Sequence, residues 1–248
     1  MGQETPRLED VPGYRRRFLV TPAAGRVTAA LEDDYHCMAV TLVHDGQNIT
    51  AVEPVMERAP WTTCPGAPLQ LIDTFTGVAR ADVAARGEKQ ANCTHLHDLA
   101  VLAAAHWADL EPTRYDIFVS DHRDGDNASE IRRNGVLVHH WEMAGGFSMI
   151  VPEAVAGLNL MKLRGWIETL EPAEKEAAKL LQWGSIVAHG RARPLDQQSD
   201  ASKMPPSCYT FQPEMAKKAS RVGLIIDFSL GDSRDLLDHF DGAHFTTV

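Results

Sequence analysis

The sequence lacks any apolar segment long enough to cross a bilayer. No run of about 18 hydrophobic residues occurs anywhere in the chain. Its first residues, MGQETPRLEDVPGY, are polar and acidic and lack the apolar stretch of a secretory signal. Cysteine is scarce as well: the chain has 4, none of them in a Cys-x-x-Cys pair. We therefore expect a cytoplasmic protein with free thiols and no membrane partner.

Positive charge is also in short supply. Lys and Arg number 24 against 34 Asp and Glu, which gives a formal net charge of -10. A chain this acidic repels the phosphates of nucleic acids and of anionic lipids unless it carries a local basic patch. The one basic cluster, Arg15-Arg16-Arg17, is short, and we interpret it as the solvated face of a strand. Nucleic acid is not an expected partner.

Common cofactor signatures are missing too. The chain has no Gly-x-Gly-x-x-Gly, no phosphate-binding loop motif, no His-Glu-x-x-His and no Gly-x-Ser-x-Gly. Their absence disfavours the commonest nucleotide-binding, zinc-protease and serine-hydrolase classes. We expect no cofactor, and the irregular separations of Cys and His match no zinc spacing rule.

What the chain does contain is the composition of a globular domain, with 44% hydrophobic and 23% charged residues. Runs of strands followed by helices predict an α+β fold, with antiparallel sheet or sheets and packed helices. We expect a flexible N-terminus at 1–13, one domain at 14–230 with a long C-terminal loop segment, and a tail at 231–248. A homodimer is possible on the base rate for proteins of this size.

Alternation and turn signals place the strands. The residues from Tyr35 to His44 alternate, with His36, Met38 and Val40 on one face and Cys37, Ala39 and Thr41 on the other. Asp45-Gly46 predicts a hairpin, and Pro54 favours an edge position for the returning strand. Further strands are predicted at 17–21, 26–31, 49–56, 115–120, 136–143 and 223–229.

Helical spacing predicts three helices. The first follows Pro65 and carries an apolar stripe of Leu69, Ile72 and Phe75. The second begins at Thr94, as its cap, and its apolar stripe extends to Leu110. The third covers 173–188. The Pro-rich stretch 191–213 is predicted to be a surface loop, with a lid over a site as the alternative.

The segment Cys93-Thr94-His95-Leu96-His97-Asp98 is the most specific candidate site. Cys93 precedes a helix start, where free amides and the helix dipole favour a thiolate. His95 and Asp98 are three residues apart and share a helix face, so the carboxylate can orient the imidazole for acid-base chemistry. The alternative is structural: a small buried Cys93, a capping Thr94 and a boundary His95.

Three motifs together, LEDDYHCMAVTLVHDG, PWTTCPGA and CTHLHDLA, resemble the bacterial domain-of-unknown-function family 2889. The resemblance extends from about Tyr14 to Arg191 and implies no settled activity. Its matching positions are His36, Cys64, Cys93, Thr94 and His95. The order of sheet, Cys at a helix start and Cys-containing helix is also similar to that of iron–sulfur scaffold proteins, which are shorter than this chain.

Three functions remain open. The first is a cofactor-independent enzyme, a lyase that acts on a small organic molecule, for instance an aromatic one. In it His95, oriented by Asp98, is the base or acid and His36 its partner, while Arg191 anchors an anionic group. The remaining predicted substrate contacts are Trp61, Cys64, Cys93 and Thr94. The second is a carrier of a metal or iron–sulfur cluster that uses Cys64, Cys93 and a His. The third is a non-catalytic subunit that binds a small molecule.

Overall fold

The computed structural model describes residues 7–122, 125–192, 200–222, 225–229 and 234–246. Its strands and helices have the α+β composition predicted from the sequence, and the strand pairs whose register is defined are antiparallel. The chain divides into two compact units. We call them the α3 unit (Phe18–Thr113, Leu195–Ile226 and Leu236–Val248) and the α5 unit (Met1–Arg17, Arg114–Pro194 and Asp227–Asp235).

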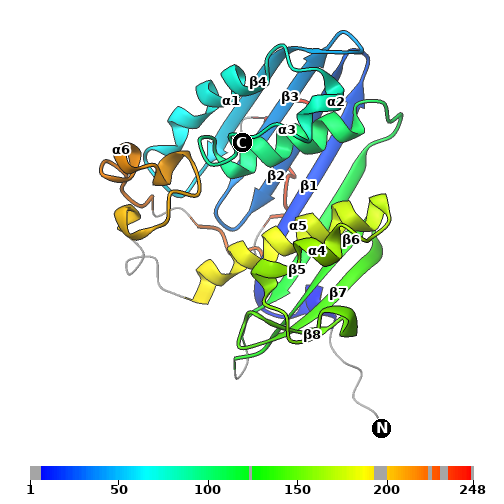
Figure 1. The fold of residues 1–248 in the computed structure, drawn as a ribbon, viewed down its shortest axis with the longest axis vertical. Helices are drawn as coiled ribbons and strands as arrows, with labels where there is room; N and C mark the ends of the chain where they lie inside the picture. Colours follow the sequence, from blue (N-terminus) through cyan, green and yellow to red (C-terminus); the bar gives the residue numbers. More distant parts are fainter. Residues whose placement is uncertain (1–6, 123–124, 193–199, 223–224, 230–233, 247–248) are drawn as a thin grey trace. The chain divides into compact units, whose positions relative to one another are not determined.

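The α3 unit has the strand order β4-β3-β2-β1, with β1 contributing its C-terminal half (Figure 1). In this unit α3 packs on β2 and β3, whereas α1 packs on β4. The elements are β1 (Gly13–Ala23), β2 (Arg26–Asp33), β3 (Cys37–His44), β4 (Ile49–Arg58), α1 (Ala67–Phe75), α2 (Arg80–Val83), α3 (Thr94–His106) and α6 (Pro213–Ala216).

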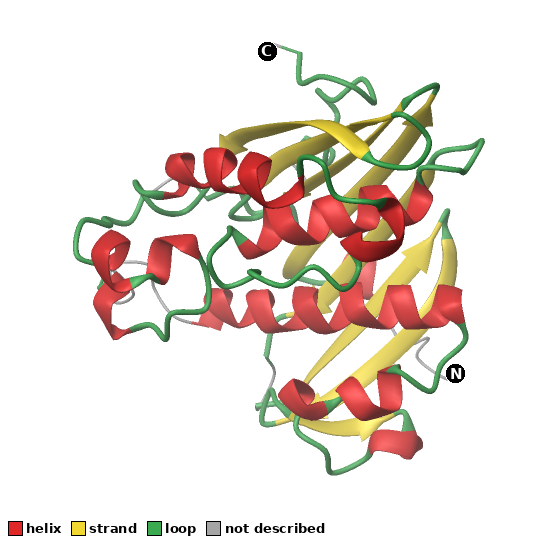
Figure 2. Cartoon of the chain, turned by 45° about the horizontal axis from the view of Figure 1, so that its top comes forward, coloured by secondary structure: helices red, strands yellow, loops and turns green. Residues whose placement is uncertain are grey.

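The α5 unit has the strand order β1-β5-β6-β7-β8, with α5 packed on β6 and β7. Figure 2 shows its helices and strands as separate layers. Asn134 and Gly135, both with positive φ, form the turn between β6 and β7. The elements are β5 (Thr113–Ser120), β6 (Asn127–Arg133), β7 (Val136–Ala144), β8 (Ser148–Val151), α4 (Arg164–Ile167) and α5 (Pro172–Ala188).

The alternation predicted for β3 is confirmed and has a clear structural result. Ala39 packs with Ala30 of β2 against Leu237 and Phe240, which come from the end of the chain. His36, of the opposite parity, lies against His95 of α3. Because successive side chains of a strand point to opposite faces, the C-terminal segment and α3 cover opposite faces of the β2–β3 hairpin.

The hairpin between β3 and β4 also follows the sequence prediction. Val40 of β3 pairs with Pro54, and β4 is the outermost strand of the order in this unit. A proline lacks the amide that an inner strand would need for its second neighbour, so an edge position suits it.

Several expectations about exposure are wrong. Leu69 of α1 is 72% exposed, because that helix buries Leu71 in its place, whereas Phe75 is buried as predicted. Leu110 is 93% exposed, because α3 ends at His106 before reaching it. Arg15 and Arg16 are buried, and Arg15 donates hydrogen bonds to backbone carbonyls, so they are no solvated strand face.

Predictions for the chain ends and for the Pro-rich stretch need correction too. Residues 1–6 lie outside the described residues, but Leu8–Asp10 forms a short 3-10 helix in which Glu9 pairs with Arg132. Between 191 and 213, the described residues include the 3-10 helices Ala201–Lys203 and Tyr209–Phe211. No strand forms at 225–229, and the predicted strand's first two residues, 223–224, are not described. Part of the predicted tail, 231–233 and 247–248, is not described either.

Candidate active site at the β2–β3 turn

The turn that joins β2 to β3 is held by one carboxylate. Asp33 Oδ1 accepts hydrogen bonds from the backbone N–H groups of Tyr35 and His36, both at 2.7 Å. The Asp33 N–H in turn donates to the His36 carbonyl at 2.9 Å. An Asp side chain that bonds the amides two and three residues ahead is a common way to stabilise a tight turn. Asp33 is fully buried, so the geometry of these four residues is fixed by the protein and not by solvent.

Arg58, at the end of β4, holds the same turn from the other side. Its guanidinium donates to the carbonyl oxygens of Asp33 and Asp34, both at 2.7 Å, and to Glu32 Oε1 at 3.1 Å. Its planar group of five N–H donors suits this many-sided contact. Both Arg58 and Glu32 are buried, so each charge is stabilised by the other in place of solvent.

His36 is oriented by Asp33. Its Nδ1 lies 3.0 Å from Asp33 Oδ1 and therefore carries the proton, since the carboxylate oxygen is an acceptor. Nε2 then offers its lone pair. A carboxylate that fixes one imidazole nitrogen so that the other can act is the usual arrangement of a catalytic or metal-binding histidine.

The structure brings His95 directly onto His36. The two ring centroids are 3.9 Å apart and the ring planes are inclined by 31°. His95 is the second residue of α3 and is half-exposed, whereas His36 is buried. A substrate that approaches from solvent would therefore meet His95 first. Asp33, His36 and His95 each offer an atom within 4.8 Å of the others, so the same set could also hold a cation.

Asp98 has a different partner from the one predicted. Lys89 Nζ lies 2.7 Å from its carboxylate, and both side chains are partly exposed. Asp98 shares the helix face of His95, as the spacing requires, but the carboxylate at the imidazole pair is Asp33. The Asp33-x-x-His36 spacing was the available sequence signal for this role.

Two of the remaining predicted residues of this unit, Trp61 and Cys64, lie near Arg221. Trp61 and Cys64 are buried in one cluster with Ala201 and Ala216, and Cys64 Sγ lies 3.2 Å from Thr210 Oγ1. The Arg221 guanidinium lies 5.0 Å from the centre of the Trp61 ring. Thr94 is buried and is the first residue of α3, not its cap as predicted, because the N-cap position is Cys93.

Arg221 is a half-buried cation that lies against two aromatic rings. Its guanidinium also lies 5.9 Å from the centre of the Tyr35 ring, and burial lowers its pKa. Its buried Nε makes no hydrogen bond, and no carboxylate among the described residues pairs with it. The ring of Tyr35 lies 6.2 Å from that of His36, so Arg221 and His36 share one aromatic neighbour.

Arg191, predicted to anchor an anionic group, belongs to the α5 unit. Its guanidinium lies 2.8 Å from Asp121 and 2.9 Å from Asp227. These two carboxylates neutralise it, so an anion would have to compete with them. Arg221, in the unit that holds the imidazole pair, has no carboxylate partner among the described residues, and it was not predicted from the sequence.

The prediction of a thiolate at Cys93 is wrong. Burial raises the pKa of Cys93 to about 12, and nearby Cys64 and Cys208 raise it further. Burial likewise raises the pKa of the Cys64 and Cys208 thiols. The loss of hydration thus outweighs the dipole of α3, which Cys93 precedes as the N-cap residue. Cys64 and Cys93 also belong to none of the three-ligand sets found among the described residues.

Cys93 should accordingly resist alkylation in the folded protein. At pH 8 we expect iodoacetamide to modify it roughly 100-fold or more slowly than a free cysteine, because so little thiolate is present. The rate should keep rising with pH up to about 12. Peptide mass spectrometry after timed alkylation measures this, with the denatured chain as the fully reactive control. A native rate close to the denatured one would contradict the assignment.

Comparisons of the chain with protein-family models, with curated proteins and with solved structures found no match. The resemblance to family 2889 therefore stays a prediction. In the part of the chain that the structure describes, no helix has the length and apolarity needed to cross a membrane.

Proposed function

We propose that this chain is an acid-base enzyme, a lyase, that acts on a small organic anion at the β2–β3 turn. The observation that carries the proposal is the 3.9 Å contact between the rings of His36 and His95, with Asp33 behind His36. Two imidazoles in contact, one oriented by a buried carboxylate, suit proton removal and proton return near neutral pH.

Arg221 gives the proposal its substrate class. A half-buried guanidinium between Tyr35 and Trp61, with no carboxylate partner among the described residues, favours an anionic ligand such as a carboxylate. The aromatic rings beside it would favour a planar or aromatic body on the same ligand. This assignment replaces Arg191 as the anchor.

The chemistry is an elimination in which charges balance. His95 takes a proton from the carbon next to the substrate's carboxylate, and the electrons of that C–H bond form the new C=C bond. The bond to the leaving group breaks with its electron pair, and His36, protonated on both nitrogens with Asp33 as its counter-charge, gives its Nε2 proton to the departing group. Because the two rings are in contact, the proton held by His95 can return to His36 and restore the starting state.

Hydrogen exchange tests the proposal without knowledge of the natural substrate. In D₂O with a panel of aliphatic and aromatic carboxylic acids, we expect the protein to catalyse deuterium uptake at the carbon next to the carboxylate. The His95→Gln variant should lose about 100-fold or more of that rate, in the usual range for a general base. Mass spectrometry of the acids measures uptake.

His140→Gln is the matched control, because His140 pairs with Glu130 and Glu142 in the α5 unit and should leave the rate unchanged. Arg221→Met should raise the acid concentration needed for half-maximal exchange. No uptake with any acid, or an unchanged rate in His95→Gln, would refute the proposal.

A further inference from the structure

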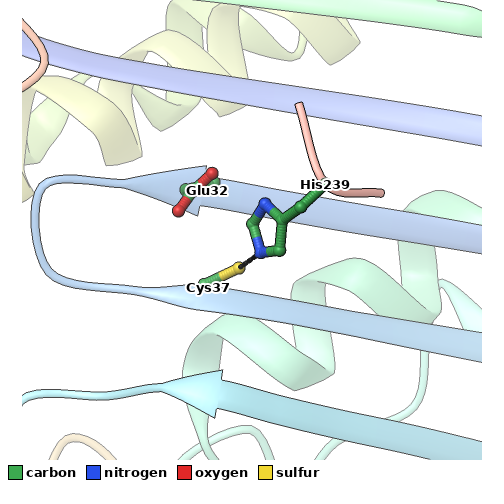
Figure 3. Close-up of side chains that lie close together, drawn as sticks. All are labelled: Glu32, Cys37 and His239. Atoms are coloured by element: carbon green, nitrogen blue, oxygen red, sulfur yellow. Dashed lines mark hydrogen bonds between the residues drawn. The ribbon is translucent and has the colours of Figure 1, made fainter. Parts of the chain in front are cut away.

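A second cluster of reactive side chains lies on the face of the β2–β3 hairpin opposite α3. Glu32 and Cys37 are directly paired across the two strands, so their side chains share this face. His239, from the C-terminal segment, completes the group, and Figure 3 shows its imidazole next to the Cys37 sulfur and beside the Glu32 carboxylate. Each residue offers one ligand-type atom, and these atoms lie within 4.8 Å of one another.

We propose that Glu32, Cys37 and His239 form a binding site for a divalent transition metal, with zinc as the best fit. Thiolate sulfur, imidazole nitrogen and carboxylate oxygen are the three donor types that proteins use for zinc. With usual Zn–S and Zn–N lengths and tetrahedral angles, the two ligand atoms are about 3.6 Å apart. Cys37 Sγ and His239 Nε2 are 3.8 Å apart.

The surroundings of His239 favour the same assignment. Its Nδ1 lies 3.2 Å from Asp238 Oδ1, so Nδ1 carries the proton and Nε2 directs its lone pair toward Cys37. A carboxylate behind a histidine is the common second layer of a zinc site, where it fixes the ring and strengthens the ligand.

Glu32 can contribute without losing its present partners. Its Oε2 accepts the Leu237 N–H at 2.7 Å, and its Oε1 accepts from Arg58 at 3.1 Å. Each carboxylate oxygen has a second lone pair for a metal. Arg58 offsets the charge of Glu32, so the Cys37 proton, released on binding, is the main charge adjustment.

A metal here would fasten the C-terminal segment to the sheet. Leu237 and Phe240 already pack on Ala30 and Ala39, and His239 lies between them in sequence. A metal bond to His239 would add a link between residues about 200 positions apart. Metal that binds only the folded chain stabilises it by mass action.

The test is metal binding by the full chain after chelation and dialysis. We expect one zinc per chain by elemental analysis. With cobalt in place of zinc, we expect a thiolate-to-metal charge-transfer band and the visible bands of a tetrahedral site. Cys37→Ser and His239→Gln should each weaken zinc binding by about 100-fold, and Asp238→Asn by roughly 10-fold.

Two matched variants locate the metal. Cys208→Ser is a cysteine control outside the cluster, and His95→Gln removes a member of the imidazole pair on the other face. Both should bind zinc as the wild type does. No stoichiometric metal, unchanged binding in both Cys37→Ser and His239→Gln, or loss of binding in His95→Gln would each overturn the proposal. Far-UV circular dichroism confirms that each variant is folded.

Discussion

Arg58→Met is expected to lower the free energy of unfolding by about 3–5 kcal/mol, the usual result of leaving a buried charge without its partner. The substitution removes the cation beside Glu32, which is fully buried, and also the donors to the carbonyls of Asp33 and Asp34. Urea unfolding followed by circular dichroism measures the change.

Two comparisons separate the reasons for that loss. Arg26→Met breaks the exposed pair with Glu53 and should cost less than about 1 kcal/mol. Glu32→Gln combined with Arg58→Met removes both buried charges and should recover part of the stability. The structure indicates that the turn depends on Arg58. A loss of unfolding free energy in Arg58→Met no larger than that in Arg26→Met would contradict this.

Trp141→Ala is the second substitution with a large expected effect. Trp141, on β7, has the largest fully buried side chain among the described residues. The centre of its ring lies 6.1 Å from that of Trp166. Its truncation leaves a cavity and should cost about 3–5 kcal/mol. Calorimetric or urea unfolding provides the measurement.

Trp141→Phe is the matched control. The buried Trp141 Nε1 has no hydrogen-bond partner among the described residues, so the loss of this N–H breaks no bond. Phenylalanine keeps most of the apolar volume, and the cost should stay below about 1.5 kcal/mol. Equal losses in the two variants would mean that ring volume does not decide the stability here.

Local patterns predicted much of the α3 unit. The alternation around Met38 and Val40 gave the faces of β3, and the residues after Asn92 gave the start of α3, because both depend on neighbours in sequence. That pattern also placed His36 and Cys37 on opposite faces, as found. Helix ends and exposed positions such as Leu110 were less predictable, since tertiary packing decides where α3 stops.

The parts of the site that the sequence did not predict come from distant segments. His239 contacts Cys37, which lies 202 positions earlier in the sequence, and Arg221 contacts Tyr35, which is also distant in the sequence. No periodicity links such residues. The pKa of the Cys93 thiol likewise depends on burial by distant segments. A prediction based only on its position before a helix does not include that burial. The spacing of Asp33 three residues before His36 was the local signal, and it corresponds to the carboxylate found beside His36.

The short turn between β2 and β3 sets the parity of everything that follows it. If the turn kept its length, one residue inserted or deleted between Asp33 and Cys37 would shift the pairing of β3 with β2 by one residue and turn every side chain of β3 to the opposite face. Cys37 and Ala39 would then face α3, and Met38 would be placed under the C-terminal segment. A single length change would thus take the imidazole pair and the Glu32–Cys37–His239 cluster apart together.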